Sequence, residues 1–341
     1  MELIVGIDDF LTENQLFQIL ATGSKITLCS RYTPLLIVDS DYPEELKSLP
    51  FVTSIEKGRI GEYQSQGHYN STLLILPPIV SKVALKKTGC VGWGVKVAIL
   101  DSGCPPGFQP HKSKDFFGGG IVDCRNHGIF VTTIINHYAA GALIYIANIG
   151  SYKPSEIALL KALEWAADEG VDLINISSGF GPQKCKGNCV LANLIDAISS
   201  QTHTVIVTAA GNSGPNINTI NCPSCAKLAV SVGAISSQGS LADYSSRGKI
   251  GGAKPDILAP GEVCLNTMCD SGTSFAAPVI TGILAATLKY SSGKGAVQRL
   301  YDTAKTLGLN RHEEGYGAVN IDRYLEVITH GRSDGASEGQ K

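Results

Sequence analysis

The sequence predicts an α/β fold in which a three-layer domain, with a parallel sheet between two layers of helices, follows a small α+β domain of the ferredoxin-like type. Two features predict the three-layer domain: apolar runs without polar alternation, and helical segments between those runs. This combination is typical of parallel strands that are covered on both faces. A length of 341 residues exceeds one average domain and fits a large domain plus a small one.

The small domain is expected to span residues 1–62, with strands and helices in the order βαββαβ. Its predicted strands are residues 3–7, 26–29, 35–38 and 51–55, and its predicted helices are residues 13–20 and 43–49. Pro43, followed by two acidic residues, is typical of the first turn of a helix. The βαββαβ order is that of the ferredoxin-like fold.

The large domain is expected to span residues 73–330. Its predicted strands are residues 95–100, 142–146, 173–176, 205–208 and 229–232, and its predicted helices are residues 127–137, 155–169, 191–200, 274–290 and 297–307. The stretch 59–72 is polar with few large aliphatic side chains, which predicts an exposed linker; we place the connector and its cleavage region at 63–72. The small, polar tail 331–341 is expected to be disordered.

The charge and hydropathy of the chain argue against several partners. Lys plus Arg is 28 and Asp plus Glu is 30, so the net charge of −2 predicts neither a nucleic-acid nor a membrane partner. No apolar run approaches the roughly 20 residues that a membrane span requires. Acidic residues at Glu2, Asp8 and Asp9 occupy the place of a signal peptide's apolar region, so we expect a cytoplasmic protein.

Three polar residues lie near the ends of the apolar runs, where ligands bind in an open parallel sheet. Asp101 directly follows an apolar run, His127 opens an apolar helix, and Ser274 begins another helix. Taken singly, an Asp in a turn, a structural His and an N-cap Ser are ordinary features. Pro278 is expected in the first turn of the Ser274 helix, because proline disrupts a helix interior.

Taken together, the motifs Asp101-Ser-Gly, His127-Gly and Gly272-Thr-Ser-Phe-Ala-Ala-Pro resemble the subtilisin-like serine proteases in type and in chain order. The resemblance extends over about residues 76–327. A nucleotide-binding protein is disfavoured because no glycine-rich turn links a strand to a following helix, and an α/β-hydrolase has the order Ser, acid, His instead.

The resemblance implies a catalytic role for four residues. Ser274 is the expected nucleophile, His127 the general base, and Asp101 the group that orients the imidazole. Asn212, in the motif Ala209-Ala-Gly-Asn, is the expected oxyanion donor together with the backbone N–H of Ser274.

The resemblance also implies a substrate cleft beside these residues. One wall of the primary specificity pocket is expected from Ser177, Ser178 and Gly179, the other from Ala209 and Ala210, and the floor from Asn221 or Cys222. None of these carries a carboxylate, so we expect an uncharged side chain before the scissile bond.

Two departures from the family pattern concern metals and packing. The family sequence Gly-Thr-His-Val-Ala-Gly is replaced by Gly128-Ile-Phe-Val-Thr-Thr, and the segment 137–141 is too short for the family's calcium-binding loop. Calcium needs about six to eight oxygen ligands. We therefore expect no tight calcium site and no required cofactor.

Ten cysteines in a chain without a secretory signal are expected to be mostly thiols or metal ligands. In the family, the loops that carry Cys185 and Cys189 and that carry Cys222 and Cys225 lie side by side. These four sulfurs are expected to be unlinked thiols, ligands of one zinc ion, or two disulfides; the sequence leaves the three alternatives open.

The small domain resembles the subtilisin propeptide, which implies that it assists folding and inhibits the enzyme. Residues 52–63 resemble the strand and tail that enter the active site, so residues 62–66 are expected in the cleft and self-cleavage within 62–72. A permanent accessory domain is the alternative. The chain as a whole is expected to be the proenzyme of a serine endopeptidase acting on flexible proteins or peptides, and the alternative is a catalytically silent regulatory or binding protein of the same fold.

Overall fold

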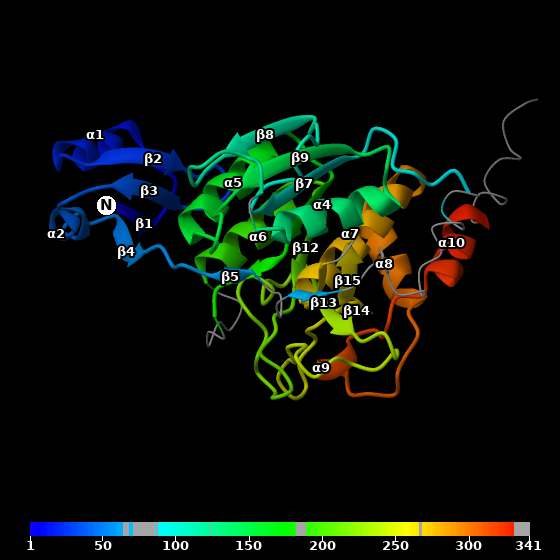
Figure 1. Cartoon of the computed structure of the whole chain (residues 1–341). Coiled ribbons are helices and arrows are strands. Elements are labelled where there is room, and N and C mark those ends of the chain that lie inside the picture. The colour runs from blue at the N-terminus through cyan, green and yellow to red at the C-terminus, as the bar shows by residue number, and fades with distance from the viewer. Residues whose placement is uncertain are drawn as a thin grey trace, which may run out of the picture.

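The computed structural model describes residues 1–63, 68–70, 85, 88–123, 125–181, 189–265 and 268–330. It consists of a small N-terminal domain and a large domain beside it (Figure 1). Among the described residues, no helix combines the length and the hydropathy that crossing a bilayer requires.

The N-terminal domain is one four-stranded antiparallel sheet with two helices. Its elements are β1 (Glu2–Ile7), α1 (Glu13–Ala21), β2 (Lys25–Cys29), β3 (Leu35–Asp39), α2 (Pro43–Lys47) and β4 (Val52–Lys57). The strand order is β2-β3-β1-β4. Both the βαββαβ order along the chain and the element bounds match the sequence expectation to within a few residues.

Both faces of this small sheet are apolar, because alternate residues of a strand point to opposite faces. Leu36 and Val38 of β3 join the core beneath α1 and α2. Leu35 and Ile37 of the same strand, with Ile4 of β1, join instead a core cluster of the large domain. The second face of the sheet is therefore an interface with the large domain.

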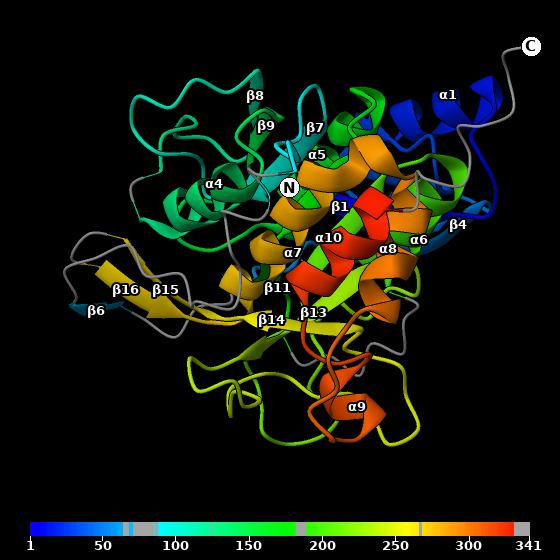
Figure 2. The same cartoon turned by 90° about the vertical axis from the view of Figure 1, so that its right-hand side faces the viewer.

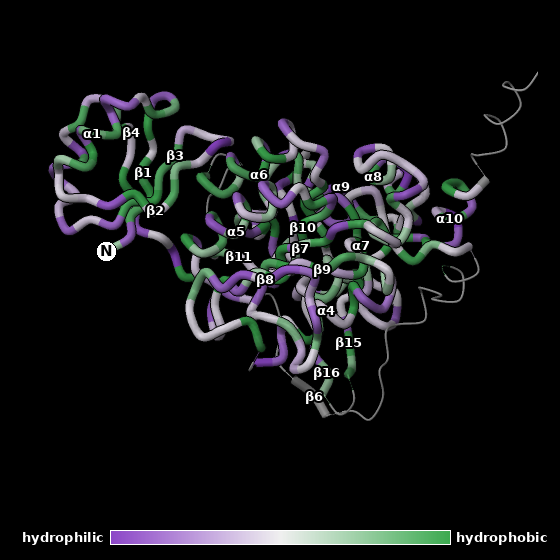
Figure 3. The backbone as a smooth tube through the Cα atoms, turned by 90° about the horizontal axis from the view of Figure 1, so that it is seen from above, coloured by the Kyte–Doolittle hydropathy of each residue, from purple (hydrophilic) through white to green (hydrophobic). Residues whose placement is uncertain are grey.

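The large domain is built on a seven-stranded sheet in the order β14-β13-β12-β10-β7-β9-β8, and every neighbouring pair is parallel. The strands are β7 (Lys96–Asp101), β8 (Lys112–Asp115), β9 (Leu143–Asn148), β10 (Leu173–Ile176), β12 (Val205–Ala209), β13 (Val230–Ile235) and β14 (Ile257–Pro260). The prediction of a parallel three-layer α/β fold is confirmed. Figure 3 shows hydrophobic colouring along the central strands β7 and β10.

Two strands of the main sheet were missed by the sequence analysis, and both lie at its edges. β8 consists of Lys-Ser-Lys-Asp and is largely exposed, so it carries no apolar run. β14 is a buried run of only four residues that ends in Pro260. Edge strands of these kinds give little periodic signal.

Helices cover both faces of the sheet. On one face lie α4 (His127–Tyr138), α7 (Thr273–Thr287), α8 (Gly293–Asp302) and α10 (Ile321–His330). On the other lie α5 (Glu156–Asp168) and α6 (Val190–Gln201), which also face the N-terminal domain. Every residue of α7 is buried, and Figure 2 shows this helix behind α8 and α10. The short helices α9 (Arg311–Glu314) and η1 (Leu288–Tyr290) complete the helical elements described.

Two helix predictions need correction. Pro278 does not lie in the first turn of α7 but further inside, because the helix already begins at Thr273. The helix expected at 297–307 is α8, which begins at Gly293 because the Ser292 side chain caps it by accepting a hydrogen bond from the Gly295 N–H.

Two small sheets lie outside the main one. β5 (Glu62–Tyr63) pairs with β11 (Ser178–Gly179). β15 (Glu262–Leu265), β16 (Met268–Ser271) and β6 (His68–Asn70) form the other, which projects from the body in Figure 2. Cys264 and Cys269 face each other across the β15–β16 pair and form a disulfide, so this cysteine pair departs from the expectation of thiols.

Candidate active site

Asp101 and His127 meet at the carboxyl edge of the main sheet. Asp101 is the last residue of β7, and His127 is the first residue of α4. His127 Nδ1 lies 2.7 Å from Asp101 Oδ1, and both side chains are buried. The imidazole is thus held by its Nδ1, which leaves Nε2 as the nitrogen able to exchange a proton with another group.

Glycine at position 128 permits this approach of α4 to the end of β7. A Cβ atom on Gly128 would lie 2.2 Å from the Gly103 carbonyl oxygen, far inside van der Waals contact. The Gly128 N–H also donates to Ser102 Oγ at 3.0 Å. The motifs Asp101-Ser-Gly and His127-Gly therefore occur together because the turn after β7 packs closely on the start of α4.

The surroundings of His127 favour its protonated form. Burial lowers the pKa of His127, but the charge and hydrogen bond of Asp101 and the charges of Asp270 and Asp123 outweigh burial, so the pKa lies above its ordinary value. Such a raised pKa makes the imidazole a stronger base for the hydroxyl proton of a nucleophile.

Ser274 lies in the first turn of α7, and its backbone and side chain both contact Ser177. Ser274 Oγ donates to the Ser177 carbonyl oxygen at 2.7 Å, and Ser177 Oγ donates to the Ser274 carbonyl oxygen at 2.8 Å. Pro278 has no N–H, so the Ser274 carbonyl lacks its usual helical donor four residues later. Pro278, which lies further inside α7 than predicted, thus leaves the Ser274 carbonyl available to Ser177.

A buried hydrogen-bond chain extends this contact. Thr281 Oγ1 donates to Asn175 Oδ1 at 2.9 Å, and Asn175 Nδ2 donates to Ser177 Oγ at 2.9 Å. The chain connects α7 back to the end of β10 and so fixes the start of α7 relative to the sheet. The ring of Phe275, next to Ser274, lies with its centroid 5.7 Å from that of His127.

Asn212 follows β12 and faces the same helix start. Its Oδ1 accepts hydrogen bonds from the backbone N–H and from Oγ1 of Thr273, each at 3.0 Å. This arrangement orients the amide, because with Oδ1 held by Thr273 the Nδ2 group is the end that donates elsewhere. A donor so fixed beside Ser274 is suited to binding a developing oxyanion.

The residues expected to form the specificity pocket follow neighbouring strands. β10 and β12 pair in register up to Ile176 and Thr208, so Ser177 and Ala209 follow adjacent strand ends. The Asn221 N–H donates to the Ala210 carbonyl at 3.0 Å. All six predicted pocket residues are placed at this corner of the domain; Ser177, Ser178, Gly179, Ala209, Ala210 and Asn221 are each buried.

The end of the N-terminal domain runs into this corner. β5 pairs antiparallel with β11, so that Tyr63 faces Ser178 and Glu62 faces Gly179. The Tyr63 ring lies 4.5 Å, centroid to centroid, from the His127 imidazole, and its hydroxyl donates to the carbonyl of Gly150. Residues 59–63 therefore contact the large domain beside the candidate site, although Ile60 and Glu62 are exposed as the composition predicts; most of the predicted connector 63–72 lies outside the described residues.

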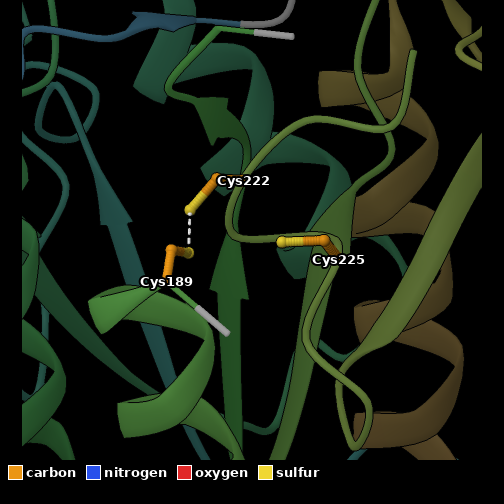
Figure 4. A group of neighbouring side chains, drawn as sticks. All are labelled: Cys189, Cys222 and Cys225. Atoms are coloured by element: carbon orange, nitrogen blue, oxygen red, sulfur yellow. Dashed lines mark hydrogen bonds between the residues drawn. The ribbon is translucent and has the colours of Figure 1, made fainter. Parts of the chain in front are cut away.

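Three of the four cysteines that were expected to cluster come together, as Figure 4 shows. The sulfurs of Cys189, Cys222 and Cys225 all lie within 4.8 Å of one another, and those of Cys189 and Cys222 are 2.8 Å apart. Cys185 lies outside the described residues. This geometry is compatible with all three predicted alternatives: thiols, ligands of a zinc ion, or, after a small movement of Cys189 and Cys222, a disulfide.

The sequence analysis missed residues that act on the candidate site from a distance. Asp123 and Asp270 add negative charge near His127, and Glu156 of α5 binds Arg59 of the N-terminal tail. Asp270 lies four residues before Ser274 in the same motif, so its proximity to the site could have been predicted from the sequence. Glu156 and Arg59 are 97 residues apart, so no local pattern indicates their contact.

Comparison with protein families and curated proteins places these residues in a known context. The model described as the subtilase family matches residues 92–318. Subtilisin E of Bacillus subtilis (strain 168) is 29% identical over 316 residues, covering 83% of this chain and 78% of subtilisin E. Subtilisin DY of Bacillus licheniformis is 30% identical over 275 residues, covering 72% of this chain and 96% of subtilisin DY.

Solved structures share the fold. Fervidolysin from Fervidobacterium pennivorans, a keratinolytic enzyme related to subtilisin, superposes with a TM-score of 0.72 at 18% identity, covering 95% of this chain and 60% of fervidolysin. The prenylagaramide maturation protease PagA superposes with a TM-score of 0.62 at 23% identity, covering 74% of this chain and 99% of PagA.

Proposed function

The chain belongs to the subtilase family of serine-type endopeptidases, and we propose that it hydrolyses peptide bonds with Ser274 as nucleophile, His127 as general base and Asp101 as the orienting acid. The observation that carries this assignment is the buried 2.7 Å contact between His127 Nδ1 and Asp101 Oδ1 at the edge of the sheet where α7 presents Ser274. Asn212 Nδ2 and the Ser274 N–H bind the oxyanion.

The reaction begins with a rotation of the Ser274 hydroxyl. Its Oγ donates to the Ser177 carbonyl, so the proposed reaction requires a turn about the Cα–Cβ bond that places the hydroxyl within hydrogen-bonding reach of His127 Nε2. His127 then takes the hydroxyl proton as Oγ attacks the substrate carbonyl, and returns it to the leaving amine. Water hydrolyses the acyl-enzyme by the same proton transfers in reverse order.

The N-terminal domain serves as an inhibitory prodomain in this proposal. Its tail adds a strand to β11, the edge that an extended substrate would use, and Tyr63 covers His127. A substrate cannot occupy this edge while the tail is bound. Self-cleavage follows the paired residues, within 63–72, and the specificity pocket accepts an uncharged side chain.

Intact-mass analysis of the purified chain tests the proposal. The wild-type protein is expected to yield two fragments cut within residues 62–72, because the tail is already paired in the cleft. Ser274→Ala is expected to remain whole, since it lacks the nucleophile.

A wild-type chain that stays intact under conditions where it is folded would contradict self-processing. Cleavage of the Ser274→Ala variant at the same bond, at the wild-type rate, would contradict the role of Ser274.

A further inference from the structure

The prodomain tail makes its strongest polar contact outside the reacting centre, at Arg59. Glu156 binds this arginine with both carboxylate oxygens: Arg59 Nε donates to Oε2 at 2.9 Å, and a terminal guanidinium nitrogen donates to Oε1. The Arg59 backbone N–H also donates to Oε2 at 2.8 Å, and the Glu156 N–H donates to the Arg59 carbonyl at 2.9 Å. Two-point pairing of this kind recognises a planar guanidinium better than an ammonium group.

The surroundings of Glu156 form a built site for this cation. The Glu156 side chain is only 4% exposed, so its charge has little water to solvate it. The guanidinium also lies over the ring of Phe180, 5.7 Å from its centroid, and donates to Cys222 Sγ at 3.5 Å. With the tail bound, Arg59 is the cationic partner of this buried carboxylate, so a tail or peptide that occupies the site without a cation would leave a buried charge unpaired, which is costly.

The position two residues after Arg59 is also selected, but by shape. A Cβ atom on Gly61 would lie 2.6 Å from the Gly179 carbonyl oxygen and 2.6 Å from Phe180 Cδ1. The Gly61 N–H donates to the Pro154 carbonyl at 2.8 Å, so the tail lies between two edges of the large domain. Only glycine fits between them without displacing the backbone or a buried ring.

From these contacts we infer that Glu156, Phe180 and Gly179 form a recognition subsite for extended peptides that carry an Arg-x-Gly sequence on the amino-terminal side of the cleaved bond. The prodomain occupies this subsite with Arg59-Ile-Gly61, and protein substrates that carry the same pattern compete for it. This inference rests on the proposed peptidase function, because it describes how that cleft selects its substrate.

A competition between peptides tests the subsite. The self-processed wild-type protein, separated from its cut N-terminal fragment so that the cleft is open, is given an equimolar mixture of a peptide with the sequence of residues 56–70 and its Arg59→Gln analogue, and mass spectrometry follows both cleavages. Because both peptides share one enzyme, the ratio of their rates gives the ratio of kcat/KM whatever fraction of enzyme is active. The arginine peptide is expected to be cut about 10- to 100-fold faster, and a Gly61→Ala analogue is expected to be cut more slowly than its parent by a similar factor.

Two enzyme variants separate the ion pair from general effects. In Glu156→Gln the preference for the arginine peptide is expected to fall to within about threefold of unity, since the two-point charge pairing is gone. Glu169→Gln is the matched control, because Glu169 caps the same helix but pairs with Lys112. It is expected to keep the wild-type ratio.

Equal cleavage of the two peptides by the wild-type protein would overturn the subsite while leaving the peptidase function intact, as would an undiminished preference in Glu156→Gln. If no peptide is cut at all, the peptidase function fails and the subsite is tested by hydrogen exchange in the intact Ser274→Ala chain. In the intact Ser274→Ala chain, the additional substitution Arg59→Gln is expected to increase the hydrogen-exchange rate of the Gly61 N–H about 10-fold or more. An unchanged exchange rate would overturn the inference.

Discussion

The Asp101 carboxylate controls His127 in two ways at the scale of single residues. Through the 2.7 Å contact at Nδ1 it fixes the orientation of the ring, and through its charge it raises the affinity of the ring for a proton. The second effect opposes burial, which alone would favour the neutral ring. In the proposed mechanism, catalysis needs the neutral imidazole before attack and the protonated imidazole afterwards, so the raised pKa of His127 is expected to set the pH range of activity.

The pH dependence of self-cleavage follows from this shift. Because the pKa of His127 is raised above its usual value of about 6.5, the neutral base is lost earlier as the pH falls. The acid limb of the self-cleavage rate is therefore expected to have its midpoint above about pH 6.5, measured by following intact mass in a single turnover.

The same shift affects stability with a definite sign. The protonated His127 stabilises the fold fully below about pH 6.5, and this contribution is lost as the pH rises through the higher folded-state pKa. For the self-cleavage rate, an acid limb with its midpoint well below pH 6.5 would contradict the raised pKa of His127.

At the scale of elements, the start of α7 is held in place by polar contacts that its sequence alone does not suggest. Pro278 has no N–H to donate to the Ser274 carbonyl, and the Ser177 hydroxyl donates to that carbonyl instead. Asn175 and Thr281 continue the chain of hydrogen bonds into the buried side of the helix. Ser274, the proposed nucleophile, is thus positioned by the end of β10 as well as by its own helix.

The variant Ser177→Ala tests this arrangement. It leaves the Ser274 carbonyl and Asn175 Nδ2 without their partner in a buried region, so the free energy of unfolding is expected to fall by about 1–3 kcal/mol. Urea unfolding of the variants in a Ser274→Ala background measures the change. Ser200→Ala is the control, because Ser200 is exposed and its hydroxyl donates to the Ala197 carbonyl of its own helix, so its loss is expected to cost less than about 0.5 kcal/mol; equal costs for the two variants would contradict the account.

Much of the fold and the site was predictable because the information is local. An apolar run such as that of β7 identifies a buried strand, and Asp101, His127, Asn212 and Ser274 each lie in a short motif at the end of such a run or at a helix start. The remaining features depend on contacts between distant segments. Neither the charged edge strand β8 nor the Glu156 subsite has a pattern of its own, because each is defined by what packs against it.

At the scale of the whole molecule, the N-terminal domain is held by two separate attachments. Its tail lies in the cleft, and the second face of its sheet joins the core of the large domain through Ile4, Leu35 and Ile37. Arg31 and Lys161 add ion pairs around this interface, to Asp168 and Glu2. Cutting the tail alone therefore leaves the apolar attachment in place, so the fragment is expected to remain bound after self-cleavage.

The variant Ile37→Asp tests the apolar attachment. A carboxylate there would be buried without a partner, so the affinity of the cleaved fragment is expected to fall at least about 100-fold. Size-exclusion chromatography of the self-processed protein is expected to show one peak for the wild type and separated fragments for the variant. Phe17→Asp is the control, because Phe17 is 69% exposed on α1; dissociation in this control as well would contradict the assigned interface.

The central claim is that Ser274 is a nucleophile activated by His127 and Asp101, and fluorophosphonate labelling tests it most directly. Peptide mapping of the self-processed protein, separated from its N-terminal fragment so that the cleft is open, is expected to place the label on Ser274. The labelling rate is expected to fall about 10⁴-fold in Asp101→Asn, because the imidazole then holds the wrong tautomer. Labelling of Ser274 at an undiminished rate in Asp101→Asn, or no labelling of the folded wild-type protein from which the fragment has been removed, would contradict the claim.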